Sequence, residues 1–394
     1  MDEDLLCSDC AKDKNLVTYI NNHGYAGKCS LCVRQRLRVA STSQLANLFK
    51  ALIRYHYNEW AYNPHFGGDD PSTLLHQENP IIKTSNIGVA EAADPSFNFD
   101  NFIEALTSPV YPDSPETDNS GVWIYRGSDA DGRNLYPESL QERRDPRVRA
   151  LSNYLAHTNY YELEVFWKDL LATHLQRIEK TISVDDEYYR ARIGVEEERL
   201  KQLPTQEWQQ VVVPHIGDKI APPPQFRATA GRLNRQNIAY LYVATDSSTA
   251  LAEVRPHPGH FVSLGRFRAT REIKVVDLAN VVLWPFALND EALDMFVLLR
   301  TIEHAFATPV TPGDEVGYLA TQFLADVIRQ SGYAGVTYRS SVTKGTNLTV
   351  FEPSAFEYVA GSASARKVKG VEYEHVPVPT ETAKDPQARY LPPS

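Results

Sequence analysis

The stretch "TAGRLNRQNIAYLYVATDSSTALAEVRP" (229–256) carries the pattern that decides the fold of the C-terminal half. Arg232 follows a glycine in a predicted turn, Tyr242 lies in an apolar strand, and Glu253 lies in a short helix opened by serine and threonine. Arginine offers a planar fork of donors that suits a diphosphate. Tyrosine offers a flat face, and glutamate accepts hydrogen bonds from sugar hydroxyls. Together, these three residues predict a pocket for an anionic, ribose-bearing ligand. Taken singly, Arg232 could instead be solvated, Tyr242 could belong to the core, and Glu253 could be exposed on its helix.

The composition is that of a soluble globular protein. Of the 394 residues, 42% are hydrophobic and 23% are charged, and the net charge is −10. Such a chain lacks the overall basic character that nucleic-acid binding needs, and it has no run of about 18 apolar residues that could form a transmembrane helix. The start, Met1 to Asp4, is acidic where a secretory signal is basic. We therefore expect a cytoplasmic protein with neither a membrane nor a nucleic acid as partner.

The four cysteines lie within the first 32 residues, as Cys7-x-x-Cys10 and Cys29-x-x-Cys32. Two such pairs can hold one tetrahedral ion with four sulfurs, which is the ligand set of a structural zinc site. The alternatives are two disulfides or four free thiols, but clustering of this kind is not how a secreted disulfide scaffold uses cysteine. The spacing predicts a zinc ribbon over residues 1–35 with a structural Zn²⁺.

Residues 36–183 are predicted to form a helical domain. Apolar spacing predicts a helix at 42–60 and a longer helical region at 147–182, whose apolar stripe is expected to pack on the first helix. Glycine, aspartate and proline predict a loop at 62–85. A segment rich in proline, serine and aspartate predicts a mobile insertion at 107–121.

Residues 184–376 are predicted to form a mixed α+β domain, followed by a proline-rich extended tail at 377–394. Segments rich in valine, tyrosine, threonine and isoleucine predict strands, and two amphipathic segments predict helices between them. The predicted strands are 240–245, 260–264, 273–278, 335–339 and 347–353, and the predicted helices are 290–307 and 317–331, with Gly332 ending the second helix.

From "YYRAR" (188–192) through 230–264 to "YLATQFLADVIRQSGYAGVTYRSS" (318–341) and "NLTVF" (347–351), the chain resembles the RES-domain family. The cysteine ribbon and the helices are similar to the HEPN/RES N-terminal domain that precedes some RES domains. A HEPN ribonuclease carries an arginine and a histidine close together on a helix, whereas the simple match here, Arg255 to His260, contains prolines that exclude a helix. We therefore expect the helical domain to be scaffold or regulation.

The resemblance implies a fold like that of the ADP-ribosyltransferase toxins and action on NAD⁺. Family members hydrolyse or phosphorolyse NAD⁺, and several are toxins held in check by an antitoxin. This implies NAD⁺ as substrate and an antitoxin or immunity protein as partner, and it leaves room for a homo-oligomer. Transfer of ADP-ribose to a protein is one alternative. A non-enzymatic zinc-ribbon adaptor with a nucleotide-binding RES domain is another.

Five family residues carry over to this sequence, and the chemistry of NAD⁺ cleavage suggests a role for each. Arg190 and Arg232 would hold phosphate, Tyr242 would pack on the ribose or nicotinamide, and Glu253 would bond the ribose and stabilise the cation. Ser340 would bind phosphate or the nicotinamide ribose, but Ser341 is equally placed, and Arg339 stands where the family usually has proline. The resemblance thus implies Arg190, Glu253 and Ser340 as catalytic and all five as NAD⁺-binding residues. The stretch between Arg190 and Arg232 is longer than in the smallest family members, so we expect residues 221–230 to act as an additional lid.

Overall fold

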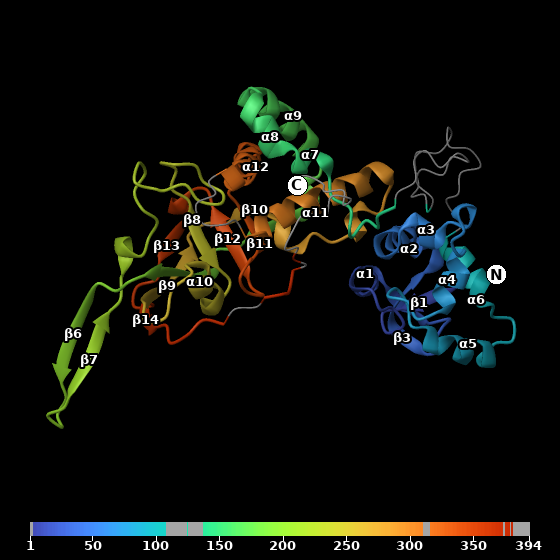
Figure 1. Ribbon diagram of the computed structural model, residues 1–394. Coiled ribbons are helices and arrows are strands. Elements are labelled where there is room, and N and C mark those ends of the chain that lie inside the picture. Colours follow the sequence, from blue (N-terminus) through green and yellow to red (C-terminus); the bar gives the residue numbers. More distant parts are fainter. Residues whose placement is uncertain are drawn as a thin grey trace.

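The computed structural model describes residues 3–107, 124, 137–309, 316–372, 375–378 and 380 of the 394-residue chain. The insertion predicted at 107–121 lies outside these residues apart from Thr107, and so does most of the tail predicted at 377–394. None of the described helices is long and apolar enough to cross a bilayer. Figure 1 shows a smaller N-terminal unit beside a larger C-terminal unit, with helix α11 (Asp290–Ala307) reaching from one toward the other.

The N-terminal unit combines a small antiparallel sheet with a layer of helices. Helix α2 follows β3 directly because Ser41 and Gln44 form a capping box, in which each side chain accepts a hydrogen bond from the other residue's backbone N–H. The helix predicted at 42–60 ends at His56, since the side chain of Asn58 accepts from the Ala61 N–H at 3.1 Å and starts a new helix. The elements are β1 (Leu5–Cys7), α1 (Lys14–His23), β2 (Tyr25–Lys28), β3 (Gln35–Ser41), α2 (Thr42–His56), α3 (Glu59–Tyr62), α4 (Pro71–His76), α5 (Ile87–Ala93) and α6 (Phe99–Thr107).

The segment 62–85, predicted as a loop, contains helix α4. The side chain of Asp70 accepts hydrogen bonds from the backbone N–H groups of Ser72 and Thr73, and Pro71 occupies the first turn. Proline suits the first helical position because its missing N–H would have no partner there. The Asp–Pro pair is therefore a helix start, and the loop prediction is wrong at this point.

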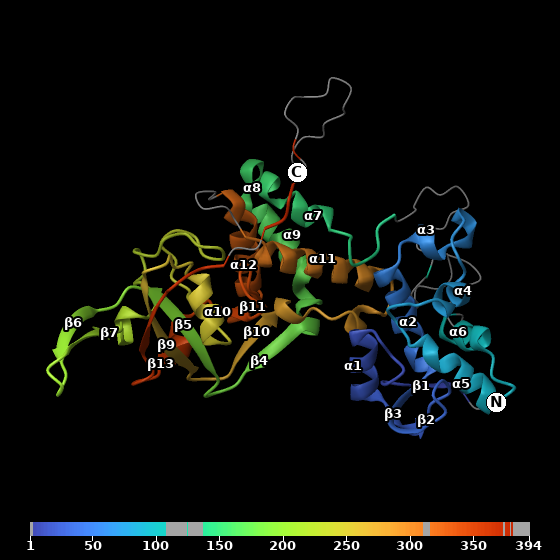
Figure 2. The ribbon, with the colours of Figure 1, turned by 60° about the horizontal axis from the view of Figure 1, so that its bottom comes forward.

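The helical region predicted at 147–182 consists of separate short helices and ends as a strand at residues 179–182. Its apolar stripe packs on α12 of the C-terminal unit, and not on α2 as predicted; both views show these helices beside α12 (Figures 1 and 2). The ring centroid of Phe323 in α12 lies 4.9 Å from that of Tyr160 and 6.5 Å from that of Trp167. The helices are α7 (Pro146–Arg149), α8 (Leu151–His157) and α9 (Tyr160–Ala172).

The C-terminal unit is built on one twisted sheet, in the order β13-β9-β5-β8-β12-β11-β10-β4, with β14 also pairing with β9. Neighbours are antiparallel except β10 and β11. The five predicted strands and both predicted helices are confirmed, and Gly332 has the positive φ of +94° that ends α12. The elements are β4 (Glu179–Ile182), β5 (Glu187–Ile193), β8 (Leu241–Ala244), α10 (Ser247–Glu253), β9 (Phe261–Ala269), β10 (Ile273–Asp277), α11, α12 (Leu319–Gln330), β11 (Gly335–Arg339), β12 (Thr346–Val350), β13 (Phe356–Tyr358) and β14 (Ser364–Lys367).

No strand is predicted where β6 (Glu197–Gln202) and β7 (Trp208–Val213) occur. They form an antiparallel hairpin that extends away from the rest of the C-terminal unit (Figures 1 and 2). Most of their side chains are exposed, so no alternation of buried and exposed residues marks them in the sequence.

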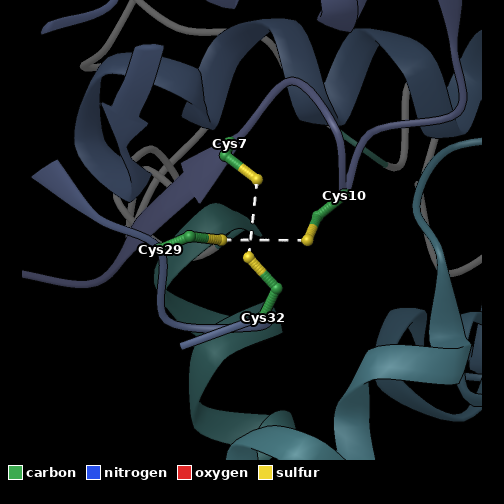
Figure 3. A group of neighbouring side chains, drawn as sticks. All are labelled: Cys7, Cys10, Cys29 and Cys32. Atoms are coloured by element: carbon green, nitrogen blue, oxygen red, sulfur yellow. Dashed lines mark hydrogen bonds between the residues drawn. The ribbon is translucent and has the colours of Figure 1, made fainter. Parts of the chain in front are cut away.

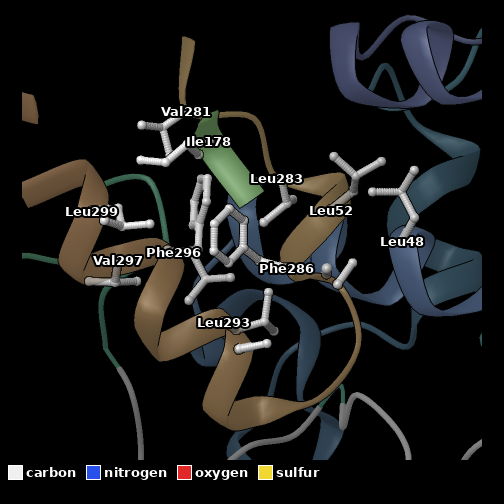
Figure 4. Close-up of a cluster of buried hydrophobic side chains, with 14 of the residues drawn as sticks. Leu48, Leu52, Ile178, Val281, Leu283, Phe286, Leu293, Phe296, Val297 and Leu299 are labelled. Atoms are coloured by element: carbon white, nitrogen blue, oxygen red, sulfur yellow. The ribbon is translucent and has the colours of Figure 1, made fainter. Parts of the chain in front are cut away.

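One hydrophobic core continues from the N-terminal unit into the C-terminal unit. Figure 4 shows Leu48 and Leu52 of α2 close to Phe286 and Leu293, and all four side chains are buried. Burial of side chains of this size stabilises a fold by about 1.5–3 kcal/mol each. At the same junction Arg54 Nη1 donates to Asp290 Oδ1 at 2.5 Å, at the first residue of α11. The cysteine-bearing unit therefore packs firmly on α11.

Candidate active site

A cavity of about 200 Å³ opens in the C-terminal unit between β5, β8, α10 and the β11–β12 pair. Three of the five predicted site residues line it together, although they lie far apart in the sequence: Arg190, Tyr242 and Glu253. Tyr338 and Asn347 line it as well. The remaining lining residues are Tyr189, Ala191, Val243, Ala244, Ala250 and Val254.

Glu253 is the last residue of α10, the short helix that begins where the side chain of Asp246 accepts from the Thr249 N–H at 2.8 Å. Its Oε1 accepts two hydrogen bonds of 2.6 Å, one from Ser340 Oγ and one from Asn347 Nδ2. Oε2 has no hydrogen-bond partner within the described part of the chain. The carboxylate is thus held by one oxygen while the other remains available at the cavity.

Arg190 crosses the gap where β5 and β8 separate. Its Nε donates to Ile220 O at 2.8 Å, and its Nη1 donates to Tyr242 O at 2.9 Å. Burial lowers the pKa of Arg190 to about 10, so the side chain is still positively charged at neutral pH. Both acceptors are neutral carbonyls, which orient the guanidinium without cancelling its charge. The cavity wall therefore attracts an anionic group.

Tyr242 joins strand β8 to the turn that carries Arg232. Its hydroxyl donates to Asn234 Oδ1 at 2.7 Å and accepts from the Leu233 N–H at 3.2 Å. Burial raises the pKa of Tyr242, so the phenol stays neutral. The turn depends on Gly231, since a Cβ there would lie 2.6 Å from Asn234 Oδ1. With its hydroxyl occupied, Tyr242 offers its ring as a wall of the cavity.

Arg232 lies next to the cavity and does not line it. Its Nη1 donates to the carbonyls of Phe306 and Thr308 at the C-terminal end of α11, the latter at 2.6 Å. Helix ends leave such carbonyls unsatisfied, and their partial negative charge suits a cation. Its Nη2 also lies 3.4 Å from Ser341 Oγ. Arg232 is therefore positioned by α11, and its predicted role in holding phosphate stays a prediction.

The two neighbouring serines have different contacts. Ser340 Oγ accepts from the backbone N–H groups of Val342 and Thr343, at 3.2 and 3.1 Å, while it donates to Glu253. Ser341 instead contacts Arg232. The serine turn thus joins the carboxylate to the second arginine, and neither serine lines the cavity itself.

A family model agrees with this part of the chain: residues 197–369 match the model of the RES domain. The chain contains a RES domain. The matched range includes four of the five predicted site residues, whereas Arg190 lies just before it.

The RES-domain chain is similar to a chain in "Crystal structure of the M.tuberculosis MbcT-MbcA toxin-antitoxin complex", at 15% sequence identity and a TM-score of 0.27, over 51% of this chain and 92% of that one. At this TM-score the likeness supports no conclusion about fold or function. No curated protein matches the chain.

Two residues of the RES-domain cavity were not singled out from the sequence. Tyr338 and Asn347 are directly opposite each other in the β11–β12 ladder. The pKa of Tyr338 is raised to about 12, chiefly by burial; a hydrogen bond with Thr349 and the charge of Arg232 oppose the rise, and the charge of Glu253 adds to it. Asn347 is buried in β12, and a buried amide needs hydrogen-bond partners. Asparagine is uncommon in strands, so its place inside a predicted strand is the sequence signal that marks it.

The first half of segment 221–230 lies away from the candidate site. Four of its residues line a different cavity of about 700 Å³, which Leu241 and Phe356 line as well: Ala221, Pro222, Pro223 and Gln225. Leu241 points to the opposite face of β8 from its neighbour Tyr242. The lid prediction is therefore wrong for residues 221–225, because the chain crosses the other side of the sheet here, and for residues 226–230 it stays a prediction. Ile220, just before this segment, provides the carbonyl that orients Arg190.

The four cysteines lie at one point of the N-terminal unit, with their sulfur atoms within 4.8 Å of one another (Figure 3). Cys7 Sγ is 3.8 Å from Cys32 Sγ, and Cys29 Sγ is 3.8 Å from Cys10 Sγ. A tetrahedron with Zn–S bonds of about 2.3 Å has edges of about 3.8 Å. Disulfide sulfurs would be about 2 Å apart, and the structure shows all four cysteines free. The cluster therefore fits one zinc ion.

The surroundings of the sulfurs support the same interpretation. Asn86 Nδ2 donates to Cys10 Sγ at 3.2 Å. A hydrogen bond to Cys32 raises the pKa of Arg36. Donors of this kind favour thiolates over thiols, as expected around a metal. Because four protein ligands complete a tetrahedral shell, the site suits a structural metal and leaves no position for a substrate.

Proposed function

We propose that the protein cleaves the bond between nicotinamide and ribose in NAD⁺ and acts as a toxin or defence effector that depletes this cofactor. The observation that carries the proposal is the fixed carboxylate of Glu253 in the cavity that Arg190 also lines. The RES domain supports it.

Cleavage of the nicotinamide–ribose bond needs few catalytic side chains. Nicotinamide leaves as a neutral molecule from a cationic starting state, so the reaction needs no general acid. The ribose develops positive charge at its anomeric carbon, and a nearby carboxylate stabilises that charge. Glu253 would do this through Oε2 and bond the ribose hydroxyls, while Ser340 and Asn347 keep the carboxylate in place.

The remaining residues would bind and orient the substrate. The charge of Arg190 would attract the phosphate nearest the nicotinamide ribose, and the ring of Tyr242 would pack on the nicotinamide half. Pockets that enclose a drug-sized ligand measure about 300–1,000 Å³. A cavity of about 200 Å³ therefore holds only part of the dinucleotide, and the rest would lie outside it, toward Arg232 and Ser341.

The proposal includes two further roles. The cysteine cluster would bind one structural Zn²⁺, and an antitoxin or immunity protein would restrain the activity in the producing cell. A likeness of fold to ADP-ribosyltransferases, and a HEPN-type N-terminal domain, stay predictions.

The test is product analysis with purified protein and NAD⁺. We expect free nicotinamide together with ADP-ribose, or with its phosphorylated form when phosphate is the acceptor. Glu253→Gln should lower kcat by at least about 100-fold, as removal of an electrostatic stabiliser does, whereas the exposed helix residue Glu291 should tolerate Glu291→Gln. Absence of nicotinamide, or undiminished release by Glu253→Gln, would refute the proposal. Label from the ADP-ribose half found on a protein would assign transfer instead.

A further inference from the structure

The β6–β7 hairpin is an incomplete sheet. Within the described part of the chain, β6 and β7 pair only with each other. The hairpin extends away from the rest of the C-terminal unit in both views (Figures 1 and 2). Leu200 is 68% exposed and Trp208 is 64% exposed. A two-stranded ribbon is marginally stable in water, and three or more strands with an apolar face are normally needed.

The root of the hairpin is fixed to strand β9 of the main sheet. Gly194 N–H donates to Phe261 O at 2.7 Å. Ser263 Oγ donates to Gly194 O at 2.8 Å and accepts from the His215 N–H at 2.9 Å. Both ends of the hairpin are therefore held against β9, so the ribbon projects in a defined direction.

Among the residues that the structure describes, none pairs with the backbone groups on the outer edge of β7. Leu203 N–H donates to Glu207 O, and Val213 O accepts from Glu196, so residues 207 and 213 direct these groups toward β6. Backbone groups alternate in direction along an antiparallel strand. Trp208, Gln210 and Val212 therefore direct their N–H and C=O groups away from β6, toward the open edge.

This edge lacks the usual protection against pairing. Natural sheets guard exposed edges with charged residues, proline or bulges. β7 reads "WQQVVV" and contains neither a charge nor a proline, and its register with β6 is regular. The charges within the two strands are on β6, at Glu197, Glu198, Arg199 and Lys201, whereas Glu207 lies in the turn before β7.

We propose that β7 pairs antiparallel with β7 of a second copy of this chain, about a two-fold axis at Gln210. Residues that share a face then lie opposite each other: Trp208 faces Val212 of the second copy, and Gln210 faces its own counterpart. An aromatic residue opposite a β-branched one is a favourable cross-strand pair, and two glutamines can bond through their amides. No like charges meet, because the charged strands lie on the outside. The product is a four-stranded sheet in which Leu200, Trp208 and Val212 share one face.

Sedimentation velocity of the full-length protein tests the pairing. We expect wild type to sediment as a dimer and Gln210→Pro as a monomer, because proline removes an outward N–H while leaving the bonds to β6 intact. Leu200→Pro is the matched control: it lies on the same face, and its N–H points to the outer edge of β6, so the dimer should persist. A monomeric wild type would overturn the proposal, and so would a dimeric Gln210→Pro.

A second pair of variants guards against misfolding of the proline variants. Trp208→Lys combined with Val212→Lys places charges on the pairing edge and should also halve the sedimenting mass, whereas Leu200→Lys should leave the dimer. Nicotinamide release and the melting temperature report whether each variant is folded. A dimer that survives both lysines would overturn the assignment to β7 and show that another surface joins the copies.

Discussion

At the residue scale, the site rests on the way Glu253 is held. Two donors from different elements, Ser340 and Asn347, bond the same carboxylate oxygen. Hydrogen bonds to a charged group contribute about 1.5–3 kcal/mol each. The orientation of the other oxygen therefore depends on residues that do not touch the reacting atoms.

Asn347→Ala should lower kcat/KM by roughly 10- to 100-fold, because loss of one such bond lets the carboxylate rotate away from the ribose. Steady-state kinetics of nicotinamide release measure the effect, with the exposed Asn101 changed to alanine as control. Unchanged kinetics in Asn347→Ala would show that Ser340 alone orients Glu253.

Tyr242→Phe should lower the stability of the protein without lowering its activity. The change leaves Asn234 Oδ1 and the Leu233 N–H without their partner, which costs about 1–3 kcal/mol. The ring, and with it the cavity wall, is retained. We expect a melting temperature lower by several degrees with kcat nearly unchanged. A large loss of kcat at normal stability would instead mean that the hydroxyl acts on the substrate.

Some of these residue roles could be predicted from the sequence. Arg190, Tyr242 and Glu253 were named from the family pattern, and the fold brings them to one cavity. The pattern could not show that Arg232 would be taken up by the carbonyls of Phe306 and Thr308, since α11 lies far along the chain. Such contacts depend on packing between distant elements, which local sequence does not determine.

At the element scale, α11 connects the two units. Its first residue, Asp290, bonds Arg54 of α2, and its C-terminal carbonyls hold Arg232. Near its end, buried Glu303 forms a salt bridge with Arg339, in which Oε1 lies 3.1 Å from Nε, and Arg339 immediately precedes Ser340. The same arginine donates to Ala279 O at 3.1 Å. Arg339 thus fixes the point where the chain leaves β11 and enters the serine turn.

Arg339→Gln should lower kcat severalfold by loosening Ser340, with little change in KM. The informative measurement is the double variant with Ser340→Ala, because residues that act through one another are not additive. We expect no further loss when Arg339→Gln is added to Ser340→Ala. Additive losses would contradict a positioning role, and Arg366→Gln, at an exposed site on β14, controls for loss of charge.

The sequence predicts the helices and strands more reliably than it predicts which elements pack against them. The apolar stripes at 42–60 and 147–182 indicated helices, but a stripe shows only that one face is buried and not what covers it. The region 147–182 therefore packs on α12, with Trp167 against Phe323, where packing on α2 was expected. The β6–β7 hairpin lacks a buried face and so left no pattern to detect.

At the scale of the whole molecule, the cysteine cluster and the candidate site share one continuous core. The N-terminal unit packs on α11 through Leu52 and Phe286, and α11 in turn positions Arg232. Loss of structure around the cysteines should therefore reach the RES domain.

The protein should contain one zinc ion per chain, and removing it should lower both stability and turnover. Zinc binding to a four-ligand site supplies roughly 10–16 kcal/mol in small domains, which is comparable to the whole stability of a protein. Elemental analysis gives the metal content, and melting curves before and after a strong chelator give the effect on stability. If the chelator removes the metal and the melting temperature stays the same, the zinc is not structural.

The most direct test of the central claim is a crystal structure of the Glu253→Gln variant with intact NAD⁺. We predict that the nicotinamide half occupies the cavity of about 200 Å³, with a ribose hydroxyl within hydrogen-bond distance of residue 253 and a phosphate next to Arg190. NAD⁺ bound in the cavity of about 700 Å³ on the other face of the sheet, or bound with its ribose remote from residue 253, would contradict the account.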